Sequence, residues 1–307
     1  MNKYIRAIGF NFLFLAISTI AFLVLTPLAI TIMGEEFYGL WVILSSIMLF
    51  SNVGTLGIGT IVNKFSAEET GEENKKFYGS IFSAGVLMIF PMALLTMVVL
   101  WLTSGFIARS NDLDPALEEN FKLAINVCAF GILPQYLTKI PQGFLLSQLR
   151  NEKVRLMDLL TSIMPWIGGV VISTIEKNLV WIAIWYVCLQ LFLLFGYIHF
   201  IRDDIDWFVR PNQALFKRMR SFSVFMFIES TAISLFQQFD RVVVGTVLGP
   251  VYAGVYSVGT SIGLRLTLLS GQITEVMVPY SSQKGSQKAN DELYGTIRLV
   301  SKVLSLV

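Results

Sequence analysis

Charged residues, histidine and cysteine are scarce in this sequence of 307 residues. Charged residues make up 14% of it and hydrophobic residues 54%, whereas soluble domains carry about 25% charge. This balance excludes an ordinary soluble domain. One histidine and two cysteines, Cys128 and Cys188 in apolar blocks, also exclude a zinc or iron centre built from those ligands and a disulfide framework. We therefore expect no metal and no cofactor.

The apolar residues are gathered in long blocks, and the mean hydropathy is +0.66. A helix needs about 20 apolar residues to cross a bilayer. The period-two alternation of a membrane β-barrel is absent. We therefore predict an all-α, polytopic membrane helical bundle of about eight helices plus the start of a ninth. The predicted spans are roughly 7–33, 38–62, 79–104, 121–148, 156–175, 179–200, 219–240 and 251–279.

The basic residues predict the orientation of these spans. Lys and Arg concentrate in cytoplasmic loops of membrane proteins. With the N-terminus in the cytoplasm, most of them fall inside, and those placed outside are Arg109, Lys122, Lys177 and Arg241. Topology thus explains the net charge of +2, and no nucleic-acid partner is expected. The Asp240–Arg241 pair is expected at the outer surface, with a role in a hairpin.

Two segments of the sequence repeat in one register. "TIMGEEFYGLWVILSSI" at 31–47 is echoed by "TVLGPVYAGVYSVGTSI" at 246–262, and "FYGSI" at 77–81 by "LYGTI" at 293–297. These matches predict a six-helix unit duplicated in parallel, with the path of a substrate between the halves. Residues 1–212 would form the first bundle with its linker, and 213–307 the first helices of the second. The second copy would be incomplete, so the sequence is expected to be a fragment.

Polar residues inside the predicted helices suggest where a cavity lies. A charge within a span costs about 2.5–3.5 kcal/mol on insertion scales and usually faces a cavity or a partner. Gln135, Lys139 and Gln142 share one helix face, since they are spaced four and then three residues apart. Pro134 and Pro141 are expected to kink that helix. The further candidates are Asn52, Gln237, Arg265, Glu229 and Asp240.

Two stretches carry a family resemblance. "GEEFYGLWVILSSIMLFSNVGTLGIG" and "FDRVVVGTVLGPVYAGVYSVG" resemble bacterial polysaccharide exporters, the O-antigen and capsule-repeat flippases of the multidrug/oligosaccharidyl-lipid/polysaccharide exporter superfamily. The resemblance implies a flippase that moves undecaprenyl-pyrophosphate-linked oligosaccharide repeat units across the bacterial inner membrane by alternating access. Membrane lipids and the polysaccharide polymerase machinery would be its further partners.

Such a cargo suggests a role for each candidate residue. Lys139 and Arg265 would bind the pyrophosphate, because cations suit phosphate oxygens. The amides that would bind the sugar are those of Asn52, Gln135, Gln142 and Gln237. Glu229 and Asp240 would couple an ion or a proton.

Two other functions compete with the flippase. A cation-coupled drug or metabolite antiporter of the same superfamily would favour carboxylates in the N-terminal cavity, where Lys139 is the clearly deep charge. A membrane glycosyltransferase would use Glu35 or Glu36 as a base, but the short outer loops offer little room for a substrate pocket. We therefore do not expect an enzyme.

Overall fold

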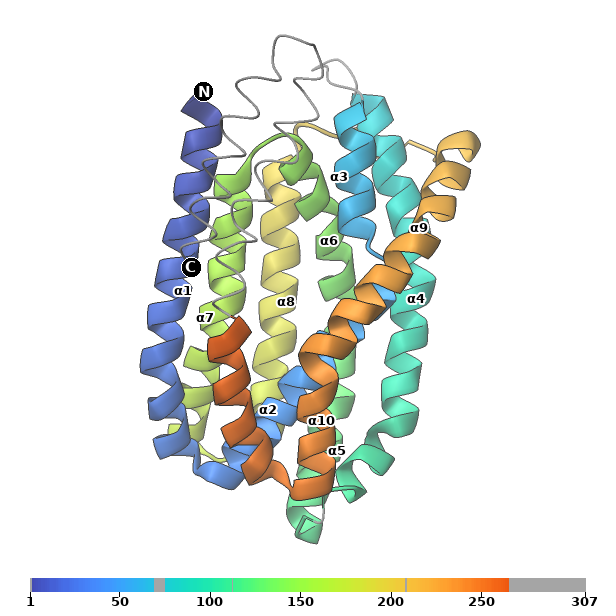
Figure 1. Ribbon diagram of the computed structural model, residues 1–307. Helices are drawn as coiled ribbons and strands as arrows, with labels where there is room; N and C mark the ends of the chain where they lie inside the picture. Colours follow the sequence, from blue (N-terminus) through green and yellow to red (C-terminus); the bar gives the residue numbers. More distant parts are fainter. Residues whose placement is uncertain (1, 69–74, 112, 208, 265–307) are drawn as a thin grey trace.

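The computed structural model describes residues 2–68, 75–111, 113–207 and 209–264, and in these ranges the regular structure is helical throughout (Figure 1). A further helix begins at residue 250 and is described as far as residue 264. The named elements are α1 Asn2–Met33, α2 Glu35–Phe50, η1 Ser51–Thr55, α3 Ile58–Glu68, α4 Lys75–Arg109, α5 Pro115–Phe130, α6 Ile132–Ser147, α7 Asn151–Ile175, α8 Leu179–Ile201, α9 Gln213–Ser234, η2 Leu235–Phe239 and α10 Asp240–Leu248.

Length and composition make the chain a multi-pass membrane protein. Among the described residues, six helical segments are long and apolar enough to cross a bilayer. Large apolar side chains such as Leu102, Phe106 and Ile175 point outward, as a surrounding of lipid tails allows. The six segments are Gly9–Met33, Glu35–Thr55, Lys75–Arg109, Pro115–Ser147, Asn151–Ile175 and Leu179–Ile201.

The two echoing stretches contain the same backbone turn. Gly34, between α1 and α2, has φ 84° and ψ 158°, and Gly249, after α10, has φ 97° and ψ 166°. This region of backbone space is open essentially to glycine alone. Gly34 N donates to Ile30 O at 2.9 Å, and Gly249 N donates to Gly245 O at 3.1 Å. The repeated glycine therefore permits the same abrupt reversal between helices at both places.

Two of the predicted spans are broken rather than continuous. The span over 38–62 divides into α2, η1 and α3, with Leu56 (φ 52°) and Gly57 (φ 65°) in the left-handed region. The span over 121–148 divides at Gly131 into α5 and α6. Pro134 has no N–H to donate to the carbonyl four residues earlier, so the helix is interrupted one turn before that proline. Pro141, in contrast, lies within α6.

The core forms where the first eight helices pack together. α1 lies against α7, α3 against α6, and α5 between α4 and α8. Tyr136 and Phe121 are the largest fully buried side chains, and the Tyr136 hydroxyl donates to the backbone oxygen of Ser51 and bonds Thr96. This tie holds α6 against η1 and α4.

The segment between α8 and α9 is hydrogen-bonded to the first turns of α4. Asp206 N donates to Lys75 O at 3.1 Å, and Ser83 Oγ donates to Val209 O at 2.7 Å. Arg150 forms an ion pair with Asp204 before α7 begins. This carboxylate raises the pKa of the Arg150 guanidinium above its ordinary value, mainly by hydrogen bonding.

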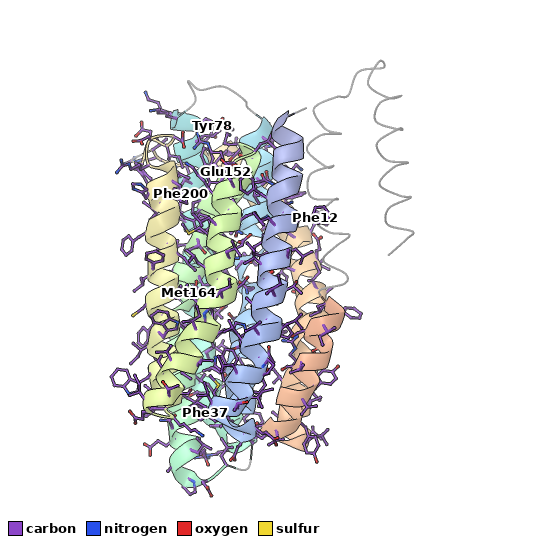
Figure 2. The ribbon with its side chains drawn as sticks, turned by 90° about the vertical axis from the view of Figure 1, so that its left-hand side faces the viewer. Phe12, Phe37, Tyr78, Glu152, Met164 and Phe200 are labelled. Carbon is purple, nitrogen blue, oxygen red and sulfur yellow. The ribbon has the colours of Figure 1, made fainter. Side chains whose placement is uncertain are left out.

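The two ends of the bundle are easy to tell apart. Figure 2 places Tyr78, Glu152 and Phe200 near one end, Phe37 near the other, and Met164 between them. In Figure 1, α9 runs obliquely across the front and leads into α10. α9 packs on α3, α4 and η1, while α10 packs on α2, next to the Gly34 turn.

Candidate functional site

A cavity of about 340 Å³ lies between helices that are far apart in the sequence. Its wall is formed by residues of α1, α2, η1, α5, α6, α7 and α8, together with α10 and the helix that begins at residue 250. This volume is within the range of about 300–1,000 Å³ that is usual for small-molecule sites. The cavity is therefore the candidate site.

Lys139 lies in the cavity wall at the start of a chain of polar contacts. Its Nζ donates to Gln142 Oε1 at 3.4 Å, and Gln142 Nε2 donates to Asp158 Oδ1 at 3.4 Å. Lys139 and Gln142 come from α6, and Asp158 comes from α7. The lysine is thus linked to a carboxylate through an amide.

Asp158 also forms an ion pair with Arg155, one turn earlier on α7. Arg155 Nη1 and Asp158 Oδ2 lie 2.8 Å apart, and both side chains are largely buried. Arg155 Nε donates to Asn11 Oδ1 of α1 at 2.7 Å. Because the pair is hydrogen-bonded from two sides, its two charges compensate each other within the bundle.

Two amides from different helices contact each other in the cavity lining. Gln135 Nε2 of α6 donates to Asn52 Oδ1 of η1 at 3.1 Å, and Tyr186 of α8 donates its hydroxyl to Gln135 Oε1 at 2.7 Å. All three residues line the cavity. Asn52 lies in η1, the short helix that continues α2 just before the break at Leu56 and Gly57.

Aromatic rings line the end of the cavity nearer to the Gly34 turn. Trp41 and Trp166 meet edge to face, with ring centroids 4.7 Å apart, and Phe22 packs on Trp166 at 5.7 Å. Tyr38 packs on Trp41 at 5.8 Å. Trp166 follows Asp158 by eight residues, which corresponds to about 12 Å along α7. The aromatic end is therefore well separated from the Lys139–Asp158 contacts.

The expectation that Arg241 lies at the outer surface is wrong. Its side chain lines the cavity and is only 9% exposed. The turn lies at Gly249, two helical turns further along the chain, which places Arg241 inside the bundle instead of in the hairpin. Its Nη2 donates to Ser261 Oγ at 3.2 Å.

The predicted site residues divide into three groups. Lys139, Gln135, Gln142 and Asn52 all line the cavity. Glu229 and Asp240 do not: Glu229 is exposed on α9, and the Asp240 carboxylate accepts the Tyr256 hydroxyl at 2.7 Å. Arg265 and the side chain of Gln237 lie outside the part that the structure describes.

Sequence reasoning missed Arg155 and Asp158, and it named Arg241 but assigned it to an outer hairpin. The apolar block was taken to begin at residue 156, so Arg155 was assigned to a cytoplasmic loop and Asp158 was not considered. In the structure α7 begins at Asn151. A helix extended by one turn would have placed Arg155, Asp158 and Ser162 on one face, three and four residues apart.

The cavity combines two kinds of chemistry. Amides, hydroxyls and cations gather around α6 and α7, and aromatic rings gather near α2. In the described ranges no three His, Cys, Asp or Glu side chains come together as metal ligands. The arrangement suits a ligand that is polar and charged.

Comparison with known proteins identifies similar chains. Residues 8–284 match the model of a family described as polysaccharide biosynthesis protein. No curated protein sequence is significantly similar to the chain.

Solved structures share the fold. One is described as the inward-facing conformation of a multidrug resistance MATE family transporter of the MOP superfamily, with a TM-score of 0.65 and 15% identity. Another, a MOP superfamily transporter from Pyrococcus furiosus, has a TM-score of 0.59 and 13% identity, and its description states that a reversed polarity of the binding pocket suggests a different function. The chain is covered to 91% and 98%, and it spans 66% and 68% of these proteins. These matches are to transporters and not to enzymes.

Proposed function

The chain belongs to the polysaccharide biosynthesis protein family, and on that premise we propose that it moves lipid-linked oligosaccharides across a membrane. The cargo would be an undecaprenyl-pyrophosphate-linked repeat unit for a cell-surface polysaccharide. The membrane would be the bacterial inner membrane, with the N-terminus in the cytoplasm. The polysaccharide polymerase machinery would receive the cargo on the other side.

The observation that carries this proposal is the cation of Lys139 beside an array of amides in one cavity. Lys139 Nζ lies 3.4 Å from Gln142 Oε1, and Gln135 and Asn52 are in contact in the same lining. A pyrophosphate is anionic and needs a positive partner, whereas sugar hydroxyls need groups that both donate and accept hydrogen bonds. The Lys139 side would bind the pyrophosphate, and the amides would bind the adjoining sugar.

Release on the opposite side requires the cavity to close at one end and open at the other. In the described conformation the end near Gly34 is closed by close helix packing: a Cβ placed on Gly39 would lie 1.9 Å from Pro250 O. A Cβ on Gly254 would likewise lie 3.0 Å from Tyr38 Cδ1. Separating these two segments would open that end, as rocking of two bundles does in transporters built from repeats.

Asp158 favours a second candidate function, export of an organic cation coupled to an ion. A carboxylate that lines the cavity, together with the rings of Trp41 and Trp166, could hold a cation. Against it, Asp158 is already paired with Arg155 at 2.8 Å. The carboxylate is therefore compensated, whereas no ion pair joins Lys139 to a described carboxylate.

The test is restoration of surface polysaccharide in a host that lacks its own repeat-unit flippase. We expect the wild type to restore it and Lys139→Ala to lower the amount about tenfold or more, since a hydrogen bond to a charged group is worth about 1.5–3 kcal/mol. Lys122→Ala, which removes an exposed lysine from α5, is the matched control and should match the wild type. Membrane levels of each variant would be compared on blots.

The two candidate functions predict different results in that host. If the wild type restores no surface sugar from any repeat-unit pathway supplied, but lowers the accumulation of cationic dyes, the flippase proposal is wrong. If Lys139→Ala acts like Lys122→Ala while the wild type restores polysaccharide, the function stands and the role of Lys139 does not.

A further inference from the structure

Arg241 brings a second cation into the cavity, at the aromatic end. Its side chain is 9% exposed and lines the cavity. Burying a charge is costly unless the charge is paired and hydrogen-bonded. Among the described residues, Arg155 is equally buried, and it meets this condition through Asp158 at 2.8 Å and Asn11 at 2.7 Å.

The contacts around Arg241 leave part of its guanidinium unsatisfied. Nη2 donates to Ser261 Oγ at 3.2 Å, but the buried Nε has no hydrogen-bond partner among the described residues. Nor does any described carboxylate form an ion pair with this guanidinium. A buried donor without an acceptor loses its hydrogen bonds to water and gains none in exchange, so an acceptor is the missing component.

The neighbouring carboxylate is engaged elsewhere. Asp240 Oδ1 accepts the backbone N–H of Arg241 at 2.8 Å, and Oδ2 accepts the Tyr256 hydroxyl at 2.7 Å. Asp240 does not line the cavity, whereas Arg241 and Ser261 do. The Arg241 side chain therefore contributes to the cavity wall, whereas the Asp240 side chain does not.

We propose that Arg241 and Ser261 form an oxyanion subsite, separate from the contacts of Lys139, which holds a carboxylate or phosphate group of the cargo. A guanidinium presents a planar fork of donors that matches two oxygens of such a group. The inference rests on the proposed function for the identity of the cargo. Trp166 at the aromatic end follows Asp158 of the Lys139 contacts by eight residues, or about 12 Å along α7, so one extended cargo can reach both ends of the cavity.

Binding to the purified chain in detergent micelles tests the subsite without transport. The probes are a disaccharide that contains glucuronate, its neutral glucose counterpart, and inorganic pyrophosphate. Tryptophan fluorescence is the readout, because Trp41 and Trp166 line the same end of the cavity. The variants are Arg241→Gln, Arg241→Lys and, as a matched control, Arg220→Gln, which changes an exposed arginine of α9.

We expect the wild type to bind at least one oxyanion probe about tenfold more tightly than the neutral disaccharide, the ratio that one charged hydrogen bond supports. Arg241→Gln should lose this difference, Arg241→Lys should keep part of it, and Arg220→Gln should keep all of it. A loss confined to glucuronate identifies a sugar acid as the occupant, and a loss confined to pyrophosphate identifies the lipid head group.

The subsite is excluded if Arg241→Gln binds both oxyanion probes as tightly as the wild type, or if the wild type does not distinguish them from the neutral sugar. Equal elution on size exclusion and an equal thermal midpoint show that the variants are folded, and Arg241→Lys covers the case in which the glutamine variant is not. If the flippase function is wrong but the subsite exists, the binding differences between the variants remain, although the wild type restores no surface polysaccharide.

Discussion

The cations in and beside this cavity differ in whether a carboxylate compensates them. Arg155 is compensated by Asp158, at 2.8 Å, and by Asn11. Lys139 and Arg241 have only amide or hydroxyl partners among the described residues, Gln142 at 3.4 Å and Ser261 at 3.2 Å. The compensated pair therefore stabilises the bundle, and the two other cations remain available to an anionic cargo.

Removing the charge of Asp158 should destabilise the protein. Asp158→Asn leaves the Arg155 guanidinium in place without its counter-charge, which should cost about 2–3 kcal/mol, somewhat less than for a fully buried pair because the aspartate side chain is 21% exposed. The thermal midpoint of the detergent-solubilised chain measures the loss.

Asp203→Asn is the matched control for this prediction. Asp203 is 88% exposed and pairs with an exposed arginine, so its substitution should leave the midpoint unchanged. Equal midpoints for Asp158→Asn and the wild type would show that the Arg155–Asp158 pair contributes nothing to stability.

Helix-face spacing predicted part of the site from the sequence. Gln135, Lys139 and Gln142 were found because they repeat along one helix, and the structure places all three in the cavity wall. Arg155 was missed, and Arg241 was assigned to an outer hairpin, because hydropathy places a span boundary wherever charges begin. A buried ion pair or a buried arginine near a span end looks the same in the sequence as a charge in a loop.

At the scale of elements, the closed end of the cavity depends on glycines at a helix crossing. Gly39 of α2 and Gly254 of the helix beginning at residue 250 face each other's segments, and α10 packs on α2 beside them. These glycines occupy equivalent positions in the echoing stretches 31–47 and 246–262. The duplication itself remains a prediction, but it would explain why a glycine occurs on both helices at the crossing.

A methyl group at this crossing should force the helices apart. The Cβ of Gly39→Ala would lie 1.9 Å from Pro250 O, a backbone atom that cannot rotate away. We expect a lower thermal midpoint and at least partial loss of surface polysaccharide in the complementation host. Gly259→Ala is the control, because its Cβ would meet nothing within 4 Å and alanine favours a helix by about 1 kcal/mol over glycine.

The outcome that contradicts this interpretation is equal behaviour of Gly39→Ala and Gly259→Ala. It would mean that α2 and the helix after Gly249 do not approach each other as closely as the structure places them.

The sequence predicted the spans better than their interruptions. Apolar blocks place the ends of α8 to within one residue and those of α1 and α4 to within five, since a bilayer sets the length of a span. The breaks at Leu56–Gly57 and Gly131 were not predicted, and the kink was expected at Pro134 and Pro141. The break at Gly131 lies one turn before Pro134, so the proline was a valid signal for it and only its exact place was not predicted. The break at Leu56–Gly57 lies in a tightly packed place, because a Cβ on Gly57 would lie 2.6 Å from Met226 Cβ, and such a contact cannot be deduced from local sequence.

At the scale of the whole molecule, exposed residues at the two ends of α4 mark the two ends of the bundle. Lys76, in the first turn of α4, and Arg109, in its last turn, are both exposed and lie at opposite ends of this one helix. If the N-terminus is cytoplasmic, the Lys76 end faces the cytoplasm and the Arg109 end faces outward.

Cysteine labelling of intact cells tests this orientation. In a background with the exposed Cys188 changed to serine, Arg109→Cys should react with a membrane-impermeant maleimide from outside. Lys76→Cys should react only after the membrane is permeabilised. The reverse pattern would show that the N-terminus lies on the outer side.

The central claim is that the cavity carries a pyrophosphate-linked oligosaccharide from one leaflet to the other. The most direct measurement reconstitutes the chain into liposomes that contain a polyprenyl-pyrophosphate-linked oligosaccharide, and follows the fraction of sugar that an external, impermeant oxidant can reach. We predict that this fraction rises with time for the wild type and that Lys139→Gln slows the rise about tenfold. A wild type that behaves like protein-free liposomes, while cationic dye crosses the same membranes, would contradict the claim.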